Sequence, residues 1–384
     1  MPEPDIRKGL DGVVVDTTTI SKVNPDTNSL LYRGYPVQEL AAKCTFEEVA
    51  YLLWNGELPD EKQLADFETF ERSHRHLDET VKRVIDELPL YANPMDVVRT
   101  AVSAIGAGDE FASDASHGAN LDKAMRLFAQ LPAIVAYDQR RRRGEQPIEA
   151  RDDLGYSANF LHMTFGDVPE LVVVNAFDVS MILYAEHSFN ASTFTARVIT
   201  STLADIYSAV VGAIGALKGP LHGGANEAVM VAFNEIGSAS KAEEWLDAAL
   251  TAKRKIMGFG HRVYKVKDPR AVILQELAQK LFAHYGKSPL YAVAEETERV
   301  SLELLSSKRV YPNVDFYSGI VYAQMGISTD TFTSIFAMAR VAGWLAHWLE
   351  QMKENKLYRP EQIYEGDHNR SYLPVDQRPG SQFP

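Results

Sequence analysis

The chain has 384 residues, of which 46% are hydrophobic and 24% charged, the composition of an ordinary globular protein rather than a disordered or repetitive one. The 39 basic and 52 acidic residues give a net charge of −13, which argues against general binding of nucleic acids or anionic membranes. The one cysteine, Cys44, excludes an intrachain disulfide and a cysteine metal cluster. The N-terminus has no secretory pattern and no apolar stretch is long enough to span a membrane, so we expect a cytoplasmic protein.

Most of the sequence predicts helix. Residues 37–54 carry apolar side chains at helical spacing, with Thr45 and Glu48 placed as a capping box. Residues 170–187 are apolar on most faces and predict a buried helix. The capping residues 190–193 interrupt it, and a second long helix is expected from Thr193 to about Leu217.

Strand signals are few. Residues 13–15 and 30–32 predict a small antiparallel pair, and no βα alternation supports a larger sheet. Near the C-terminus, residues 341–352 form an apolar helical stripe that ends before Pro360. The sequence therefore predicts an all-α protein.

Two glycine-rich places, residues 219–224 and 319–326, suggest hinges around a segment inserted at roughly 225–325. A run of four arginines, Arg140 to Arg143, has two interpretations. It either complements the C-terminal dipole of a helix or forms a phosphate-binding patch.

Four segments combine polar groups with glycine, proline and apolar residues: GPLHGGAN at 219–226, MGFGHRVY at 257–264 with Asp268-Pro269-Arg270, YPNVDFYSG at 311–319, and ARVAGW at 339–344 with Tyr358-Arg359-Pro360 downstream. Taken singly, these residues also have structural interpretations. His222 could be a hydrogen-bonded core residue, Asp315 could cap a helix, and Arg340 could be a salt-bridge partner. Together with His261, these groups suit binding of a small polycarboxylate and acid–base chemistry on it.

Nearly end to end, from about Lys8 to Pro360, the chain resembles the citrate synthase family, which includes the 2-methylcitrate synthases. The resemblance rests on segments in family order: residues 31–35 (LYRGY), 185–187 (AEH), 190–193 (NAST), and the four segments above. It implies an almost all-helical fold with two domains. The large domain would comprise residues 1–223 and 327–384 and the small domain residues 224–326, and closure between them would complete the site.

The same resemblance implies condensation of oxaloacetate with an acyl-CoA and hydrolysis of the resulting thioester, without a metal or redox cofactor. By motif match, Asp315 would remove the thioester α-proton, His222 would hydrogen-bond the enol oxygen, and His261 would polarise the oxaloacetate ketone. The other implied residues fall into two groups: oxaloacetate ligands at His187, Arg270, Arg340 and Arg359, and coenzyme A contacts at Gly258, Phe259, Gly260, Lys265 and Lys308. The resemblance places Arg359 in the neighbouring subunit's site and so implies a homodimer.

The acyl group is the open question. The N-terminal half is more similar to actinobacterial 2-methylcitrate synthases, and the C-terminal half to citrate synthases proper. We expect citrate synthase activity with acetyl-CoA first and propionyl-CoA also accepted, since one methylene is worth only about 1–3 kcal/mol in an apolar pocket. The alternatives are a 2-methylcitrate synthase that prefers propionyl-CoA, a citryl-CoA lyase, and a non-catalytic metabolite-binding paralogue.

Overall fold

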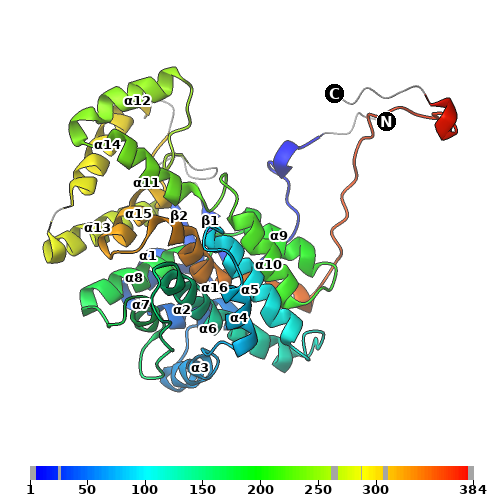
Figure 1. Ribbon diagram of the computed structural model, residues 1–384, viewed down its shortest axis with the longest axis horizontal. Coiled ribbons are helices and arrows are strands. Elements are labelled where there is room, and N and C mark those ends of the chain that lie inside the picture. The colour runs from blue at the N-terminus through cyan, green and yellow to red at the C-terminus, as the bar shows by residue number, and fades with distance from the viewer. Residues whose placement is uncertain (1–5, 25–26, 261–266, 287, 306–309, 379–384) are drawn as a thin grey trace.

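The computed structural model describes residues 6–24, 27–260, 267–286, 288–305 and 310–378. Within these ranges the chain is helical apart from one small sheet, as expected of an all-α protein. The centre of the molecule is α16 (Phe332–Lys353), which other helices surround on every side (Figure 1). Its residues are buried almost without interruption, because its small and apolar side chains face neighbours all round rather than along one stripe. The stripe predicted at 341–352 is therefore part of a fully buried core helix.

The first half of the chain supplies the helices that pack around α16. Their bounds are α1 (Val37–Lys43), α2 (Phe46–Asn55), α3 (Glu61–Ser73), α4 (Glu79–Asp86), α5 (Pro94–Gly108), α6 (His117–Arg142), α7 (Tyr156–Phe165), α8 (Leu171–Tyr184), α9 (Ala191–Thr200) and α10 (Ile206–Leu217).

Between α10 and α16 the chain forms a second group of helices that lies to one side of the molecule (Figure 1). Its members are α11 (Ala225–Ile236), α12 (Ala242–Thr251), α13 (Pro269–Tyr285), α14 (Pro289–Leu305) and α15 (Val314–Gln324). These helices contact one another, and α11, α13 and α15 also contact helices of the first group, α8 and α16.

Short 3-10 turns mark several entries and exits. They are η1 (Lys8–Leu10), η2 (Ala239–Lys241), η4 (Thr329–Thr331) and η5 (Val375–Gln377). Beyond α16 the described chain runs as an extended tail away from the helical body (Figure 1).

The capping box predicted at Thr45 and Glu48 is confirmed. The Glu48 amide donates to the Thr45 hydroxyl at 3.3 Å, and the Thr45 amide donates to the Glu48 carboxylate at 2.6 Å. Because a capping box begins a helix, the helical pattern at 37–54 is two helices, α1 and α2, that meet at this cap.

The long helix expected from Thr193 to Leu217 is wrong: the segment forms α9 and α10 with a break between them. Leu203 adopts a left-handed φ of 64°, and the Asp205 side chain caps α10 by accepting from the Ser208 amide at 2.8 Å. The hydroxyls of Ser201 and Thr202 bond back to carbonyls within α9 and end that helix. The capping role predicted for Asn190 is confirmed, since its side chain accepts from the Thr193 amide at 3.1 Å.

The predicted strand pair is half right. Residues 30–32 lie in β2 (Ser29–Tyr32), but its partners are β1 (Ser21–Asn24) and β3 (Tyr35–Pro36) rather than residues 13–15. Strands joined by a short connection pair at a lower loop-closure cost than a segment farther away in the chain. Residues 13–15 have no regular structure and Val14 is 88% exposed.

The four arginines end α6 and are held by the protein itself. Arg141 donates to the Leu88 carbonyl at 2.6 Å, and Arg142 donates to the carbonyls of Leu90 and Ala92. Arg140 and Arg143 both reach the Thr164 carbonyl. This arrangement supports the interpretation as a helix end, because the guanidinium donors fasten two neighbouring loops.

A pair of largely buried carboxyl groups that do not line the cavity described below joins three helices. Glu47 of α2 accepts from the Tyr156 amide, which begins α7, at 2.6 Å. Asp178 of α8 accepts from the Phe46 amide, which begins α2, at 3.0 Å. Burial, followed by the neighbouring Glu47 charge, raises the pKa of Asp178 to about 7.

An acid whose pKa is raised by folding stabilises the fold only while it is protonated, so this contribution is lost as the pH rises through about 7. We therefore expect the stability of the wild type relative to Asp178→Asn to fall between about pH 4, the ordinary pKa of an aspartate, and about pH 7, by about 1.4 kcal/mol for each unit of pKa difference. Urea unfolding of both chains across this range measures the difference. The same substitution at exposed Asp66 is the control, and a difference for Asp178→Asn that does not change with pH would contradict the assignment.

Cys44 lies partly buried at the end of α1. Burial, with the nearby Glu48 charge, raises the pKa of its thiol to about 11. Over the described ranges, no helix is long and apolar enough to cross a membrane.

Candidate active site

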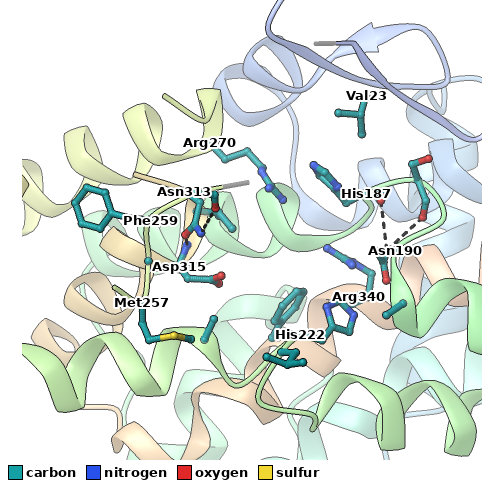
Figure 2. Close-up of a pocket in the computed structure, with 18 of the residues that line it drawn as sticks. Val23, His187, Asn190, His222, Met257, Phe259, Arg270, Asn313, Asp315 and Arg340 are labelled. Atoms are coloured by element: carbon teal, nitrogen blue, oxygen red, sulfur yellow. Dashed lines mark hydrogen bonds between the residues drawn. The ribbon is translucent and has the colours of Figure 1, made fainter. Parts of the chain in front are cut away.

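A cavity of about 730 Å³ opens where the second group of helices meets the first. Its walls come from the β1 strand, the turn before α9, the turn before α11, the start of α15 and the middle of α16. The labelled side chains of His187, His222, Arg270, Asp315 and Arg340 surround one space (Figure 2). The remaining lining residues are Val23, Ser188, Phe189, Asn190, Ala191, Leu221, Ala225, Lys255, Met257, Gly258, Phe259, Gly260, Asn313, Val314 and Phe336.

His222 is held in one protonation state by the start of α9. The Ser192 amide, in the first turn of α9, donates to His222 Nε2 at 3.3 Å, and the Ser192 hydroxyl lies 2.9 Å from the same nitrogen. A backbone amide can only donate, so Nε2 accepts and the neutral ring carries its proton on Nδ1. Burial, followed by the Arg340 charge, lowers the pKa of His222 to about 4. His222 is therefore a neutral donor through Nδ1 at physiological pH.

Asp315 lies in the first turn of α15 and faces the same cavity. The Asn313 side chain caps this helix by accepting from the Asp315 amide at 3.0 Å. The Tyr184 hydroxyl donates to Asp315 Oδ1 at 3.0 Å. Burial raises the pKa of Asp315 to about 6, while the Tyr184 hydrogen bond and the Arg270 charge oppose the rise. The result is a carboxylate of raised basicity.

Hydrogen bonds between two short backbone segments hold the start of the chain that leads to Asp315. The segments are residues 258–260 and 311–313. The Gly260 amide donates to the Tyr311 carbonyl at 2.8 Å, the Asn313 amide to Gly258 at 2.9 Å, and the Asn313 side chain to Gly260 at 2.9 Å. Gly258 has a φ of 78°, and a methyl group there would overlap Val229 and Phe316. Glycine is thus required where this turn packs against α15.

Arg340 and Arg270 supply positive charge to the cavity. Arg340 is 1% exposed, and its Nε donates to the carbonyl of Tyr184 at 2.7 Å. Burial lowers the pKa of Arg340 to about 10, and the buried Glu186 carboxylate opposes this. Arg270, at the start of α13, makes two side-chain hydrogen bonds to Asp268, at 3.1 and 2.8 Å. Asp268 therefore caps α13 and orients the arginine that follows it.

The structure brings together most of the residues predicted for the site. His187, His222, Arg270, Asp315 and Arg340 all line the cavity, as do Gly258, Phe259 and Gly260. Arg359 does not: it is exposed on the C-terminal tail, where it donates to the Pro360 carbonyl at 3.1 Å. His261, Lys265 and Lys308 lie outside the described residues.

Several residues around the cavity were not predicted from the sequence. Tyr184 bonds Asp315, Ser192 bonds His222, and Lys255 adds a cation to the lining. Phe336 lies edge-on to His222 at 6.2 Å, and the Arg340 guanidinium stacks over the same ring at 4.8 Å. The available signal was the Tyr184 hydroxyl, which follows the apolar residues 181–183 at the end of α8, directly before the Ala185-Glu186-His187 segment.

This geometry suits a dianionic substrate and proton transfer. Two arginines and a histidine can hold carboxylates, since guanidinium groups bind them through paired hydrogen bonds. A carboxylate of raised pKa can take a proton from carbon, and a neutral imidazole can donate to the oxygen that gains charge. Among the described residues, no cluster of three or more histidine, cysteine or acidic side chains could hold a metal ion.

Comparison with known proteins gives a consistent result. Residues 9–361 match the family model described as citrate synthase, C-terminal domain. The chain belongs to the citrate synthase family. Members of this family are condensing acyltransferases, and the cavity contains charged groups suited to that chemistry.

Two similar members of the citrate synthase family carry different names. The chain is 54% identical over 374 residues to a 2-methylcitrate synthase of Mycobacterium tuberculosis, covering 97% of this chain and 93% of the relative. It is also 54% identical over 374 residues to a citrate synthase of Mycolicibacterium smegmatis, covering 96% and 98%. Overall identity therefore does not separate the two activities.

Solved citrate synthases share the fold over almost the whole chain. The enzyme from Pyrobaculum aerophilum superimposes with a TM-score of 0.92 at 42% identity, covering 98% of this chain and 97% of that one. A citrate synthase of Thermoplasma acidophilum in ternary complex with carboxymethyl coenzyme A and oxaloacetate gives a TM-score of 0.93 at 33% identity, covering 97% and 100%.

Proposed function

We propose that the protein condenses oxaloacetate with acetyl-CoA, hydrolyses the thioester to citrate and coenzyme A, and also accepts propionyl-CoA. The observation that carries the proposal is the pairing of His222, neutral with its Nδ1 proton free to donate, with Asp315, a carboxylate of raised pKa, in one cavity. A thioester α-proton is too weakly acidic for a carboxylate alone. Removal by Asp315 requires a donor at the oxygen that becomes negative, and His222 is the candidate for that donor.

The proposed sequence of steps is balanced without an oxidant or reductant. Asp315 takes the α-proton and becomes a carboxylic acid, while His222 Nδ1–H stabilises the enolate oxygen. The α-carbon then attacks the ketone carbon of oxaloacetate, and the new alkoxide takes a proton from His261, the residue that the family resemblance implies. Water then adds its oxygen to the thioester carbonyl carbon and gives a proton back to His261, while the departing coenzyme A sulfur takes the proton that Asp315 holds and leaves as the thiol. One well-placed donor at the oxyanion contributes about 3–4 kcal/mol to such a step.

His187, Arg270 and Arg340 are the proposed ligands of oxaloacetate. They surround the same space from the turn before α9, the start of α13 and the middle of α16 (Figure 2). Residues 258–260 are the proposed contact for coenzyme A, together with Lys265 and Lys308. Lys255 is a further cation at this cavity and suits the phosphate-bearing substrate.

The acyl preference is tested by thiol release with oxaloacetate and either acetyl-CoA or propionyl-CoA. A ratio of kcat/KM of ten or more in favour of acetyl-CoA supports the proposal. The same ratio in favour of propionyl-CoA would establish the second candidate, a 2-methylcitrate synthase, the name carried by the M. tuberculosis relative that is as similar to this chain as the citrate synthase is. No thiol release with either substrate would overturn the proposed activity.

Tyr184→Phe should shift the acid limb of the kcat/KM profile to higher pH. Its hydroxyl donates to Asp315 and favours the carboxylate, so its removal raises the pKa of Asp315 above about 6. A hydrogen bond to a charged group is worth about 1.5–3 kcal/mol, which corresponds to a shift of about one to two pH units.

The measurement is the pH dependence of thiol release, and Tyr156→Phe is the matched control. The Tyr156 hydroxyl is also buried, but it donates to the Phe128 carbonyl at 3.2 Å, and neither residue lines the cavity. A Tyr184→Phe profile that superimposes on the wild type would show that Asp315 does not govern the acid limb.

We also propose a homodimer in which Arg359 enters the site of the neighbouring subunit. Arg359 is exposed on a tail that runs away from its own cavity, and the neighbouring tail residues Leu357, Ile363 and Tyr364 expose 58%, 48% and 62% of their surface. Apolar side chains exposed on an extended tail suit a partner surface.

Arg359→Leu should weaken oxaloacetate binding about tenfold or more, since a charged carboxylate ligand is lost. Sharing is tested by mixing this variant with Asp315→Asn. If each site combines Asp315 of one chain with Arg359 of the other, a mixed dimer has one intact site and one doubly altered site. Activity should then return to about one quarter of the wild type at equal mixing, because about half of the dimers are mixed. If activity does not recover after subunit exchange, each site uses Asp315 and Arg359 of the same chain, and the shared-site proposal is wrong.

We propose that residues 224–326 form the small domain and move against the rest as substrates bind. Gly223 and Gly224 precede α11, and Gly326, with a φ of 80°, follows α15. Asp315 lies within this segment, whereas His187 and Arg340 lie outside it. Closure would therefore move Asp315 and Arg270 relative to His187 and Arg340 and complete the site around the bound substrates.

A further inference from the structure

Behind His187, three polar side chains lie in the interior of the protein in a continuous row. Glu186, His347 and Arg197 are exposed by 0%, 0% and 2%, respectively. His347 Nε2 lies 3.0 Å from Glu186 Oε1, and His347 Nδ1 lies 3.2 Å from Arg197 Nη1. None of the three lines the cavity, so the row stands behind the site rather than within it.

The partners fix the protonation of His347. A guanidinium group can only donate, so Nδ1 accepts from Arg197, and the carboxylate of Glu186 accepts from Nε2–H. The ring is therefore neutral, with one nitrogen committed to each neighbour. Glu186 is an anion in this setting: burial disfavours the charge, but the hydrogen bonds from His347 and Ser21 and the Arg340 charge favour it, and the pKa of Glu186 lies below its usual range.

At one end, Glu186 holds the turn that carries His187. The Ser21 hydroxyl donates to Glu186 Oε1 at 2.8 Å and accepts from the Ser188 amide at 3.0 Å. The Tyr32 hydroxyl bonds the amide of Glu186 at 3.2 Å and its carbonyl at 2.9 Å. Ser188 has a left-handed φ of 55°. The hydrogen bonds of the Glu186 side chain and backbone thus hold a turn that an unsupported chain would rarely adopt.

On the other side of His347, Arg197 bonds residues from near the N-terminus and near the C-terminus of the chain. Its Nη2 donates to Asp16 Oδ2 at 2.8 Å, and its Nη1 donates to Glu350 Oε2 at 3.0 Å. Asp16 also accepts from the Tyr358 hydroxyl at 2.8 Å. Tyr358 directly precedes Arg359, so the row connects the His187 turn to the base of the tail.

We propose that His347 is a positioning residue for the dicarboxylate substrate: as a neutral bridge between Glu186 and Arg197 it fixes the turn that presents His187 and anchors the tail that carries Arg359. This inference rests on the proposed function, in which both residues bind oxaloacetate. His347 touches no substrate, and its effect is transmitted through Glu186 and Arg197.

Only a group that donates on one side and accepts on the other can serve here. His347→Leu removes both hydrogen bonds, so Glu186 and Arg197 are each left with one partner fewer in the interior. His347→Gln keeps one amide donor and one carbonyl acceptor and can span part of the gap. Rescue by glutamine therefore tests the bridge rather than the loss of volume.

The experiment measures oxaloacetate binding by calorimetry, kcat, and KM for each substrate, together with thermal unfolding of the full-length protein. We expect His347→Leu to raise the Kd and KM for oxaloacetate tenfold or more, with kcat and the KM for acyl-CoA within threefold. His347→Gln should recover most of the affinity. Trp348→Phe is the matched control, because Trp348 is 2% exposed on the same helix and lies outside the row.

A second measurement separates positioning from loss of folding. Ser21→Ala removes the other donor to Glu186 Oε1, so its effect on oxaloacetate affinity should be non-additive with that of His347→Leu. If the His347→Leu protein unfolds at a lower temperature but binds oxaloacetate like the wild type, His347 is structural and the proposal is wrong. If the wild type itself does not bind oxaloacetate, the proposed function fails instead.

Discussion

Asp315→Asn is expected to reduce the rate of condensation about a thousandfold or more while leaving oxaloacetate affinity within about twofold. Removal of a general base costs about 10² to 10⁴ in rate, and among the described residues that line the cavity Asp315 is the only carboxylate. Asparagine matches aspartate in shape, its side-chain oxygen still accepts from the Tyr184 hydroxyl, and the backbone amide of residue 315 still donates to the Asn313 cap. The expected loss is therefore chemical rather than structural.

Thiol release and oxaloacetate calorimetry on the same preparation make this measurement. Asp178→Asn serves as the control, because it makes the same substitution at another largely buried carboxyl of raised pKa, away from the cavity. Turnover by Asp315→Asn within tenfold of the wild type would show that another group removes the proton.

Gly343→Ala is expected to destabilise the fold by about 2–4 kcal/mol. A methyl group at this position of α16 would overlap Glu186 Oε2 and the carbonyl of Ala185. Alanine favours helix over glycine by about 1 kcal/mol, but overpacking costs about 1–3 kcal/mol, and disturbing the hydrogen bonds of the buried Glu186 carboxylate costs about 1–3 kcal/mol. The close approach of α16 to residues 185–186 thus explains the glycine in the ARVAGW segment.

Urea unfolding measures this effect, and Gly118→Ala is the matched control. Gly118 is also helical, but nothing lies within 4 Å of its added methyl group, so its substitution should be neutral or stabilising. The Gly343→Ala protein should also bind oxaloacetate more weakly, since the displaced segment carries His187. Equal stability of the two alanine variants would contradict the predicted overlap.

The features that the sequence predicted well depend on residues close together in the chain. The Thr45–Glu48 box, the Asn190 cap and the buried helix α8 each follow from spacing over one or a few turns. The break between α9 and α10 was missed because apolar residues continue on both sides of it. The polar residues Ser201, Thr202 and Asp205 that make it were outweighed by that pattern.

In the candidate site, too, local segments were predicted from the sequence, whereas contacts between distant residues were not. The family segments identify His222, Asp315 and Arg340, but they do not show that Ser192 fixes the tautomer of His222 or that Tyr184 bonds Asp315. These partners are 30 and 131 residues away in the sequence, and no local rule relates them. The wrong pairing of residues 13–15 has the same origin, since registry between strands is a tertiary property.

The high pKa of the single thiol has a practical consequence for kinetics. At about pH 8, a thiol of pKa about 11 is ionised in about one molecule in a thousand, and only the thiolate attacks disulfide reagents. Colorimetric assays that capture released coenzyme A should therefore have little background from the enzyme. By the same reasoning, cysteines introduced in pairs on either side of the proposed hinge can be labelled with fluorophores, and energy transfer between them would report the interdomain angle during turnover.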